Sequence, residues 1–277
     1  MIPSPGAIAA SIFTTCFGLT GCVGEARAQA DYRNLDPGHP IAVEDAQPIE
    51  FHAFEAQMGI PRFSHDGRGR WTVGFEPELK WGVLKDTQIG YSHESVVSGD
   101  ARNTVFVGRD QQVHLLYNFN REGNVLPALA VRPELAVSSG SLGSQSDHGA
   151  MKWIVSKTLG ENRIHVNGSY TVGPTAGRGQ GGDLVNRFLY GAAYERTFPL
   201  QFVVLVADVY ARKPIDGSRT AVVFDVGTRW QVAPLWVLDA GISSGALRSA
   251  AASDIGFTVG VSRSFSFRRF YPLEGST

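Results

Sequence analysis

Cysteine is nearly absent from this chain of 277 residues. The two cysteines, Cys16 and Cys22, both lie at the very start of the sequence. If the segment that holds them is removed, the remaining chain can form neither a structural disulfide nor a thiol-based active site. The fold must then rest on packing and hydrogen bonds alone.

Charge is scarce as well, at 18% of residues, against roughly 25% in an average soluble domain. The formal net charge is −1, and Lys and Arg form no stripe of the kind that DNA-binding domains carry. The histidines are scattered singly, with no two at the spacing of metal ligands on one element. The sequence therefore predicts no nucleic-acid partner, no metal and no other cofactor.

The opening stretch AIAASIFTTCFGLTGC (7–22) has the length and apolar character of a signal-peptide core, and it is too short to cross a bilayer as a helix. Ala28 and Ala30 are the small residues that a signal peptidase reads, which predicts a signal peptide over residues 1–30 and cleavage before Asp31. Residues 19–22 (LTGC) also fit a lipoprotein processing box, which would leave a lipid on Cys22. Both alternatives predict an exported protein.

Residues 31–46 carry two prolines and no periodicity, which indicates an extended leader segment. From residue 47 onward the chain alternates apolar and polar residues with the period of a β-strand, and no helical periodicity is sustained. The segments are around ten residues long, about what a tilted strand needs to cross a membrane. They lie at 47–57, 71–82, 87–97, 113–121, 128–139, 150–159, 163–172, 186–197, 202–212, 220–231, 234–244 and 254–265. A barrel is predicted over residues 47–267, with a tail at 268–277.

The connections between these segments alternate in length. The short ones lie at 84–86, 122–124, 161–162, 199–200 and 233, and the longer ones at 58–70, 98–112, 140–149, 173–185, 213–219 and 245–253. Short periplasmic turns, long external loops and an even strand number are typical of outer-membrane barrels. The predicted fold is all-β, a transmembrane antiparallel up-and-down β-barrel of about 12 strands in the bacterial outer membrane.

One face of the segments is apolar and rich in aromatic residues. Trp71 and Trp81 share a face and lie roughly 33 Å apart along an extended strand. Tilted by about 45°, that length matches the apolar band between the aromatic girdles of a membrane barrel. The residues predicted to lie at the membrane interfaces are Trp71, Trp81, Trp153, Phe198, Phe202, Trp230 and Trp236.

The other face is small or charged, as suits a narrow lumen. The predicted polar lining consists of Glu76, Glu78, Lys80, Glu94, Arg132, Glu134, Glu195, Asp208, Arg212, Asp225, Arg229 and Asp239, with Asp208, Asp225 and Asp239 at one height. Such charges would pair, either as a selectivity network or as the filling of a barrel that conducts nothing. Pro77 and Pro133 predict bulges or irregular pairing, beyond which the faces could invert.

Three stretches carry a resemblance to a known family: GFEPELKWGV (74–83), LPALAVRPELAVSSG (126–140) and GFTVGVSRSF (256–265). They resemble the outer-membrane barrels labelled MetA-pathway of phenol degradation, which are often called transporters. The resemblance extends over about residues 47–265. It implies a membrane barrel that passes small compounds, aromatic ones included. The last strand also looks like the aromatic-ended signal that barrel-insertion machinery reads, closed by either Phe265 or Phe267.

A lipid-modifying barrel enzyme, of the phospholipase or lipid A deacylase type, is the rival prediction. YSHES places His93 and Ser95 on one side of a strand, and RIHVNGS does the same for His165, Asn167 and Ser169. His165 falls on the lumen face, where lipid has no easy access, so no catalytic residue is assigned. The sequence favours a passive transporter or channel for small solutes over an enzyme or a non-conducting structural barrel. The expected partners are outer-membrane lipid, the insertion machinery and a small-molecule solute.

Overall fold

The computed structural model describes residues 31–58, 62–65, 69–100, 104–137, 147–173, 187–197, 199–215, 219–246 and 255–267. The predicted signal peptide and tail lie outside these ranges, as do Phe198 and much of the predicted external loops. Within the described ranges, no helix is long and apolar enough to cross a membrane.

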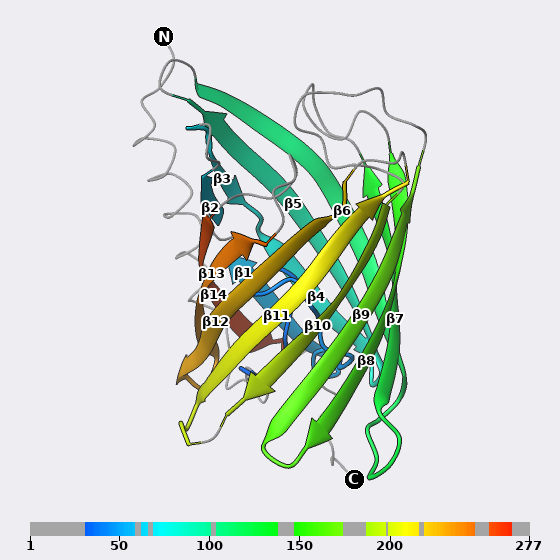
Figure 1. Ribbon diagram of the computed structural model, residues 1–277. Helices are drawn as coiled ribbons and strands as arrows, with labels where there is room; N and C mark the ends of the chain where they lie inside the picture. The colour runs from blue at the N-terminus through cyan, green and yellow to red at the C-terminus, as the bar shows by residue number, and fades with distance from the viewer. Residues whose placement is uncertain are drawn as a thin grey trace.

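The described residues form fourteen strands in one antiparallel sheet that closes on itself (Figure 1). The strands are β1 (Ala53–Met58), β2 (Arg62–His65), β3 (Trp71–Phe75), β4 (Glu78–Leu84), β5 (Thr87–Gly99), β6 (Thr104–Asn120), β7 (Ala128–Val137), β8 (His148–Leu159), β9 (Asn162–Val172), β10 (Arg187–Arg196), β11 (Val203–Pro214), β12 (Ala221–Ala233), β13 (Trp236–Gly245) and β14 (Ile255–Ser266).

Two pairs of short strands each occupy one place in the barrel wall. β1 and β2 both pair with β14, while β3 and β4 both pair with β5. Further pairing of β5 with β6 closes the circle, which gives 12 strand positions. The predicted fold, a 12-stranded antiparallel up-and-down barrel, is confirmed.

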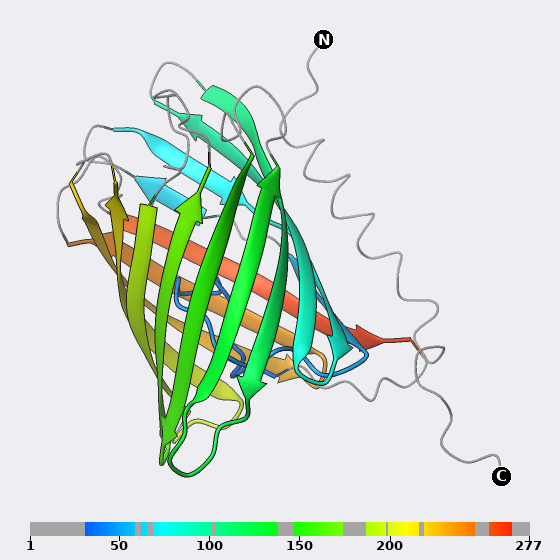
Figure 2. The same cartoon turned by 90° about the vertical axis from the view of Figure 1, so that its right-hand side faces the viewer.

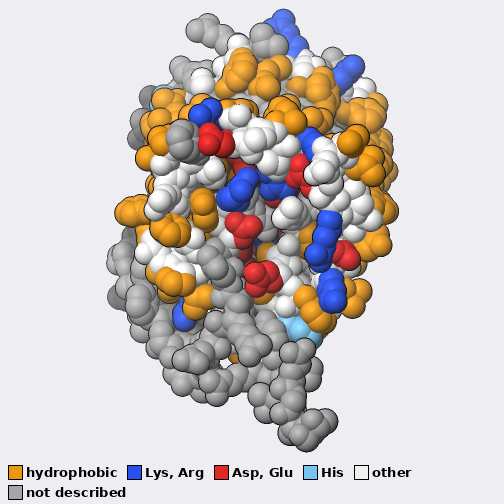
Figure 3. Space-filling model, turned by 90° about the horizontal axis from the view of Figure 1, so that it is seen from below, with side chains coloured by type: hydrophobic (Ala, Val, Ile, Leu, Met, Phe, Trp, Pro, Cys, Tyr) orange, Lys and Arg blue, Asp and Glu red, His pale blue; other side chains and the backbone are white. Residues whose placement is uncertain are grey.

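The outside of the barrel is apolar, because alternate strand residues turn outward. In β10, Phe188 and Tyr190 are about half exposed, whereas Ala193 and Glu195 are buried on the inner side. Arg263 is an outward-facing charge near a strand end, three residues before the end of β14. Its guanidinium stacks 5.0 Å from the centre of the Trp236 ring. Seen from below, apolar side chains ring a centre where charged side chains gather (Figure 3). A barrel with this distribution of side chains suits contact with lipid on its outside and polar contacts on its inside.

Pro77 interrupts the sheet but does not invert its faces. β3 ends at Phe75 and β4 begins at Glu78, yet the register against β5 is unchanged, since Phe75 pairs with Ser95 and Glu78 with Ser92. Pro133 likewise pairs with Met151 of β8 without a shift. The predicted irregular pairing is present, because no strand includes residues 76–77 and the β6–β7 pairing skips Pro133, but neither proline makes a bulge that shifts the register. A proline on the outer face loses only its own N–H donor, and the alternation continues beyond it.

The predicted loop at 98–112 is also wrong. β5 extends to Gly99 and β6 begins at Thr104, so most of that stretch is strand. Residues 104–107 (TVFV) are β-branched or aromatic, which favours a strand. A register shift between His93 and Ser95 lets the two strands stay paired despite an irregularity. The strict alternation of short and long connections fails at this hairpin.

Residues 31–52, here called the lumen segment, run inside the barrel as a coil (the blue trace in Figures 1 and 2). Leu35, Ile41 and Val43 are fully buried against inner-face residues of β10 and β11. Ala46 is buried in a second apolar cluster with residues of β6, β7 and β8. The extended leader that the sequence predicted is thus packed in the lumen.

Candidate functional site

The lumen segment enters the barrel at the end that carries the short turns. Arg33 pairs there with Glu195, 3.1 Å away and one residue before the end of β10. The segment then rises to a tight turn at residues 36–41, in which Gly38 has φ +87° and its N–H donates to the Ile41 carbonyl over 2.6 Å. From this turn the chain descends to β1. The segment therefore occupies the lower part of the lumen.

The wall makes room for the tip of this turn with two glycines. A Cβ on Gly227 would stand 2.3 Å from Pro40 Cγ, and one on Gly241 would stand 2.7 Å from Pro40 Cβ. Real Cβ atoms do not approach other heavy atoms so closely, so only glycine permits the observed position of Pro40. The neighbouring His39 lies 3.4 Å from Asp239 through its Nδ1.

Glu44 of the lumen segment is bound by two cations of the barrel wall. Its Oε1 accepts from Arg132 Nη1 over 2.9 Å, and its Oε2 accepts from Lys152 Nζ over 2.8 Å. Burial raises the pKa of the Glu44 carboxyl, but the charges of Arg132 and Lys152 outweigh it and hold the pKa below its ordinary value. Glu44 is thus an ionised group fixed between β7 and β8.

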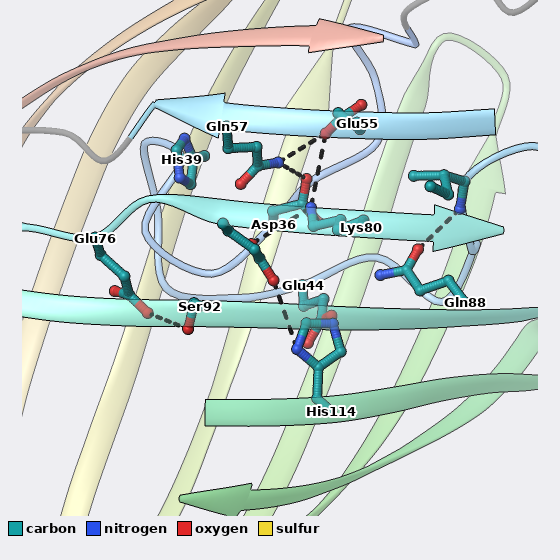
Figure 4. A network of polar contacts seen from close by, with 12 residues as sticks. Asp36, His39, Glu44, Glu55, Gln57, Glu76, Lys80, Gln88, Ser92 and His114 are labelled. Carbon is teal, nitrogen blue, oxygen red and sulfur yellow. Dashed lines mark hydrogen bonds and ion pairs between the residues drawn. The ribbon is translucent and has the colours of Figure 1, made fainter. Parts of the chain in front are cut away.

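Asp36 and Asp45 make further charge contacts. Asp36 lies 2.5 Å from Lys80 Nζ and accepts from Gln57 Nε2 over 2.6 Å (Figure 4). Burial raises the pKa of the Asp36 carboxyl, but the charges of Lys80 and Arg229 outweigh this effect and lower the pKa to about 2. Asp45 accepts from Arg163 Nη1 over 2.5 Å. In its case burial prevails and raises the pKa of the carboxyl, despite the opposing charge of Arg163.

Polar side chains of the wall also satisfy the backbone of the lumen segment, which has no strand partner of its own. The Ala42 and Val43 N–H groups donate to Asp208 Oδ2 over 2.8 and 3.0 Å. Asn167 accepts from the Glu44 N–H over 2.7 Å and donates to the Glu44 carbonyl over 2.8 Å. Because buried backbone groups must be paired, these contacts define one specific seat for the segment.

The same pattern continues toward β1. Ser156 accepts from the Ala46 N–H over 3.0 Å, and Asn118 donates to the Ala46 carbonyl over 2.7 Å. Gln88 accepts from the Ile49 N–H over 2.9 Å (Figure 4). Ser156, Asn118 and Gln88 were not among the lining residues predicted from the sequence. Their inward parity on predicted strands was a signal that could have found them.

The structure places all twelve predicted lining residues. Lys80, Arg132, Glu195, Asp208 and Asp239 contact the lumen segment as described above, and Arg229 is buried with its charge near Asp36. Glu78 lies 3.7 Å from Lys80, Glu134 lies 3.4 Å from Arg132, and Glu76 accepts from Ser92 over 3.1 Å. Arg212 stacks over Tyr210 at 5.2 Å from the ring centre, Asp225 is buried, and Glu94 is half-buried.

The three aspartates predicted at one height are not all level. Asp208 and Asp225 are direct partners across β11 and β12. Asp239 instead pairs with Arg229, four residues nearer the short-turn end than Asp225. The reason is the position of the β12–β13 turn, which lies between Ala233 and Trp236 and so sets Asp239 opposite Arg229.

The predicted interface aromatics lie mostly near strand ends. Trp81, Trp230 and Trp236 are within three residues of the short-turn ends of β4, β12 and β13, Phe202 comes just before β11, and Trp71 opens β3 at the opposite end. Trp153 lies in the middle of β8. Near the β1–β14 seam, Phe54 stacks with Trp81 at 5.7 Å and with Phe265 at 5.6 Å, and the edge of Phe267 meets Phe54 at 5.2 Å.

One cluster has the composition of a catalytic triad. Ser156 Oγ lies 2.8 Å from His165 Nδ1, and His165 Nε2 lies 3.4 Å from Glu195 Oε2. All three side chains are within 1% of complete burial. Ser156 also accepts the Ala46 N–H, so no substrate can approach its oxygen while the segment is seated. Ser169, the predicted partner of His165, lies four residues farther along β9, roughly 13 Å away.

Within the described residues, no group of three or more His, Cys, Asp or Glu side chains is placed to hold a metal ion. No family model and no curated protein matches the chain. Among solved structures it is similar to an outer membrane channel from Pseudomonas putida F1, at 12% identity and a TM-score of 0.56, over 84% of this chain and 100% of that one. It is also similar to the NanC porin, at 10% identity and a TM-score of 0.50, over 77% of this chain and 100% of that one.

A third similar structure is outer membrane phospholipase A from Escherichia coli, at 13% identity and a TM-score of 0.44, over 85% of this chain and 95% of that one. At such identities a likeness extends to the fold alone. The chain thus has the fold of outer-membrane barrels, while its activity must be argued from its own side chains.

Proposed function

We propose that this protein is an outer-membrane channel for small solutes whose lumen is closed by its own residues 31–52. The barrel presents apolar side chains outward and charged and amide side chains inward, as a water-filled conduit through lipid requires. The observation that carries the proposal is the seat of the lumen segment. Three of its acids and several of its backbone groups are bound by wall residues from β4 to β11, so it closes a polar passage by specific polar contacts.

Membrane placement is part of the same proposal. The aromatic residues near the ends of β4, β12 and β13, and the stacking of Arg263 on Trp236, suit the lower membrane interface. The cluster of Phe54, Trp81, Phe265 and Phe267 lies where the first and last strands meet, which suits the end signal that insertion machinery reads. We further propose that the protein belongs to the MetA-pathway of phenol degradation family and that its solutes are aromatic.

A channel must be able to release the lumen segment from these contacts, whereas a purely structural barrel need not. That difference can be tested. We expect the full chain in planar lipid bilayers to give low conductance, and a variant without residues 31–46 to give clearly higher conductance. Heat-dependent migration in gel electrophoresis would show that both proteins are folded barrels. Equal, negligible conductance from two folded proteins would contradict a channel.

The lipid-modifying enzyme is the alternative. The Ser156–His165–Glu195 cluster has the required residue types, but it lies inside the lumen beneath the seated segment and away from lipid. Its hydrogen bonds have a simpler role, since Ser156 holds Ala46 and Glu195 holds Arg33. We therefore propose that the protein is not an enzyme.

A further inference from the structure

A cavity of about 190 Å³ lies above the lumen segment, on the side of the long loops. Its floor is the tip of the segment, including Pro40 and Ile41. Its wall includes Lys152 of β8, Arg212 and Tyr210 of β11, Asp225 of β12 and Thr258 of β14. An apolar cavity of ~150 Å³ holds one benzene molecule, so this cavity has room for one small organic solute.

The polar groups of this cavity favour a single negative charge. Lys152 and Arg212 supply two cations, and the Arg212 guanidinium is oriented by stacking on the Tyr210 ring. Asp225 adds one acid, which disfavours a ligand with a second negative charge. Thr258 Oγ1 is buried and has no hydrogen-bond partner among the described residues. A hydroxyl in that situation can donate to an acceptor in the cavity.

Lys152 belongs both to this cavity and to the seat of the lumen segment. Its Nζ donates to Glu44 Oε2 over 2.8 Å, while Arg132 holds the other oxygen of the same carboxylate. A carboxylate bound in the cavity would compete with Glu44 for the Lys152 ammonium. The carboxylate of Glu44 would then be held by Arg132 alone, so occupation of the cavity would weaken the closed state.

We propose that this cavity binds a small monocarboxylate between Arg212 and Lys152, and that binding releases the lumen segment by drawing Lys152 from Glu44. The binding step stands on the cavity itself, whereas the release step rests on the proposed channel function. The two steps are therefore tested separately.

Binding is tested by isothermal titration calorimetry of the full chain in detergent, with butyrate and its neutral counterpart butyramide. We expect butyrate to bind, and Arg212→Gln to weaken it by about tenfold or more because a charge-assisted contact is lost. Lys213→Gln is the matched control, since Lys213 is the next residue and is exposed. Equal binding of butyrate and butyramide, or equal losses in the two variants, would overturn the site.

Release is tested by conductance with and without butyrate. We expect butyrate to increase the conductance of the wild type and to have little effect on Glu44→Gln, in which the anchor is already broken. Butyrate binding without any change in wild-type conductance would overturn the coupling and leave the binding site. If the variant without residues 31–46 also fails to conduct, the channel function itself fails, independently of the calorimetry.

Discussion

Pro40 packs against Gly241, so closely that a Cβ on this glycine would stand 2.7 Å from Pro40 Cβ and 3.0 Å from Thr258 Oγ1. The contact joins the tip of the lumen segment to the middle of β13. The backbone of β13 is held in the sheet on both sides, so the tip is the part that can yield. The steric fit of one side chain therefore helps to decide whether the lumen is closed.

Gly241→Ala is expected to displace the tip and raise the conductance of the full chain. Overpacking of this kind costs about 1–3 kcal/mol, enough to shift the segment without unfolding the barrel. Gly168→Ala is the control, because a Cβ there meets nothing within 4 Å. The measurement is single-channel conductance in planar bilayers. If both variants match the wild type, Pro40 does not control passage.

Glu44→Gln is expected to loosen the lumen segment strongly. It leaves the buried side chain of Arg132 and the partly buried side chain of Lys152 without their shared carboxylate, and breaking a buried ion pair on one side costs about 3–5 kcal/mol. Limited proteolysis should then cut the segment at protease concentrations that leave the wild type intact. Glu161→Gln breaks the exposed pair with Arg196 and should change little, under about 1 kcal/mol. Equal protection of the two variants would contradict an anchoring role for Glu44.

Acid should release the segment as well. The pKa of Asp36 is lowered to about 2 and that of Glu44 is lowered below its ordinary value, so both carboxylates stabilise the seated state above the pKa they have when released. That stabilisation is lost as the pH falls through the range from about 4 to about 2. The raised pKa of Asp45 acts in the opposite sense, because its protonation favours the buried state and partly offsets the loss.

The measurement is protease access to the segment across this pH range, with an acid-active protease such as pepsin. Asp36→Asn should abolish part of the pH dependence, because its side chain no longer gains a proton. An unchanged profile in Asp36→Asn would show that another group controls release.

The strands of the barrel wall could be predicted from the sequence, whereas the contacts of the lumen segment inside the barrel could not. Outward residues such as Phe224 and Val226 repeat with a strict period of two because lipid contacts every strand in the same way. The lumen segment has no period, since its contacts with residues such as Asn167 and Asp208 depend on where the wall places them. Three of its five acids, Asp36, Glu44 and Asp45, match the cations of the inner face, but only the barrel geometry pairs Glu44 with Arg132 and Lys152.

Ser156 is expected to stay unlabelled by a fluorophosphonate probe, because its Oγ accepts the Ala46 N–H and lies beneath the lumen segment. The His165–Glu195 pair beside it could activate a serine only if a substrate reached the lumen. The variant without residues 31–46 provides the sharper test, since it exposes the cluster. Labelling of that variant, abolished by Ser156→Ala, would show a competent nucleophile and contradict the assignment as a non-enzyme. Absence of labelling in both proteins is the expected result, because Ser156 and His165 then serve only to hold the segment.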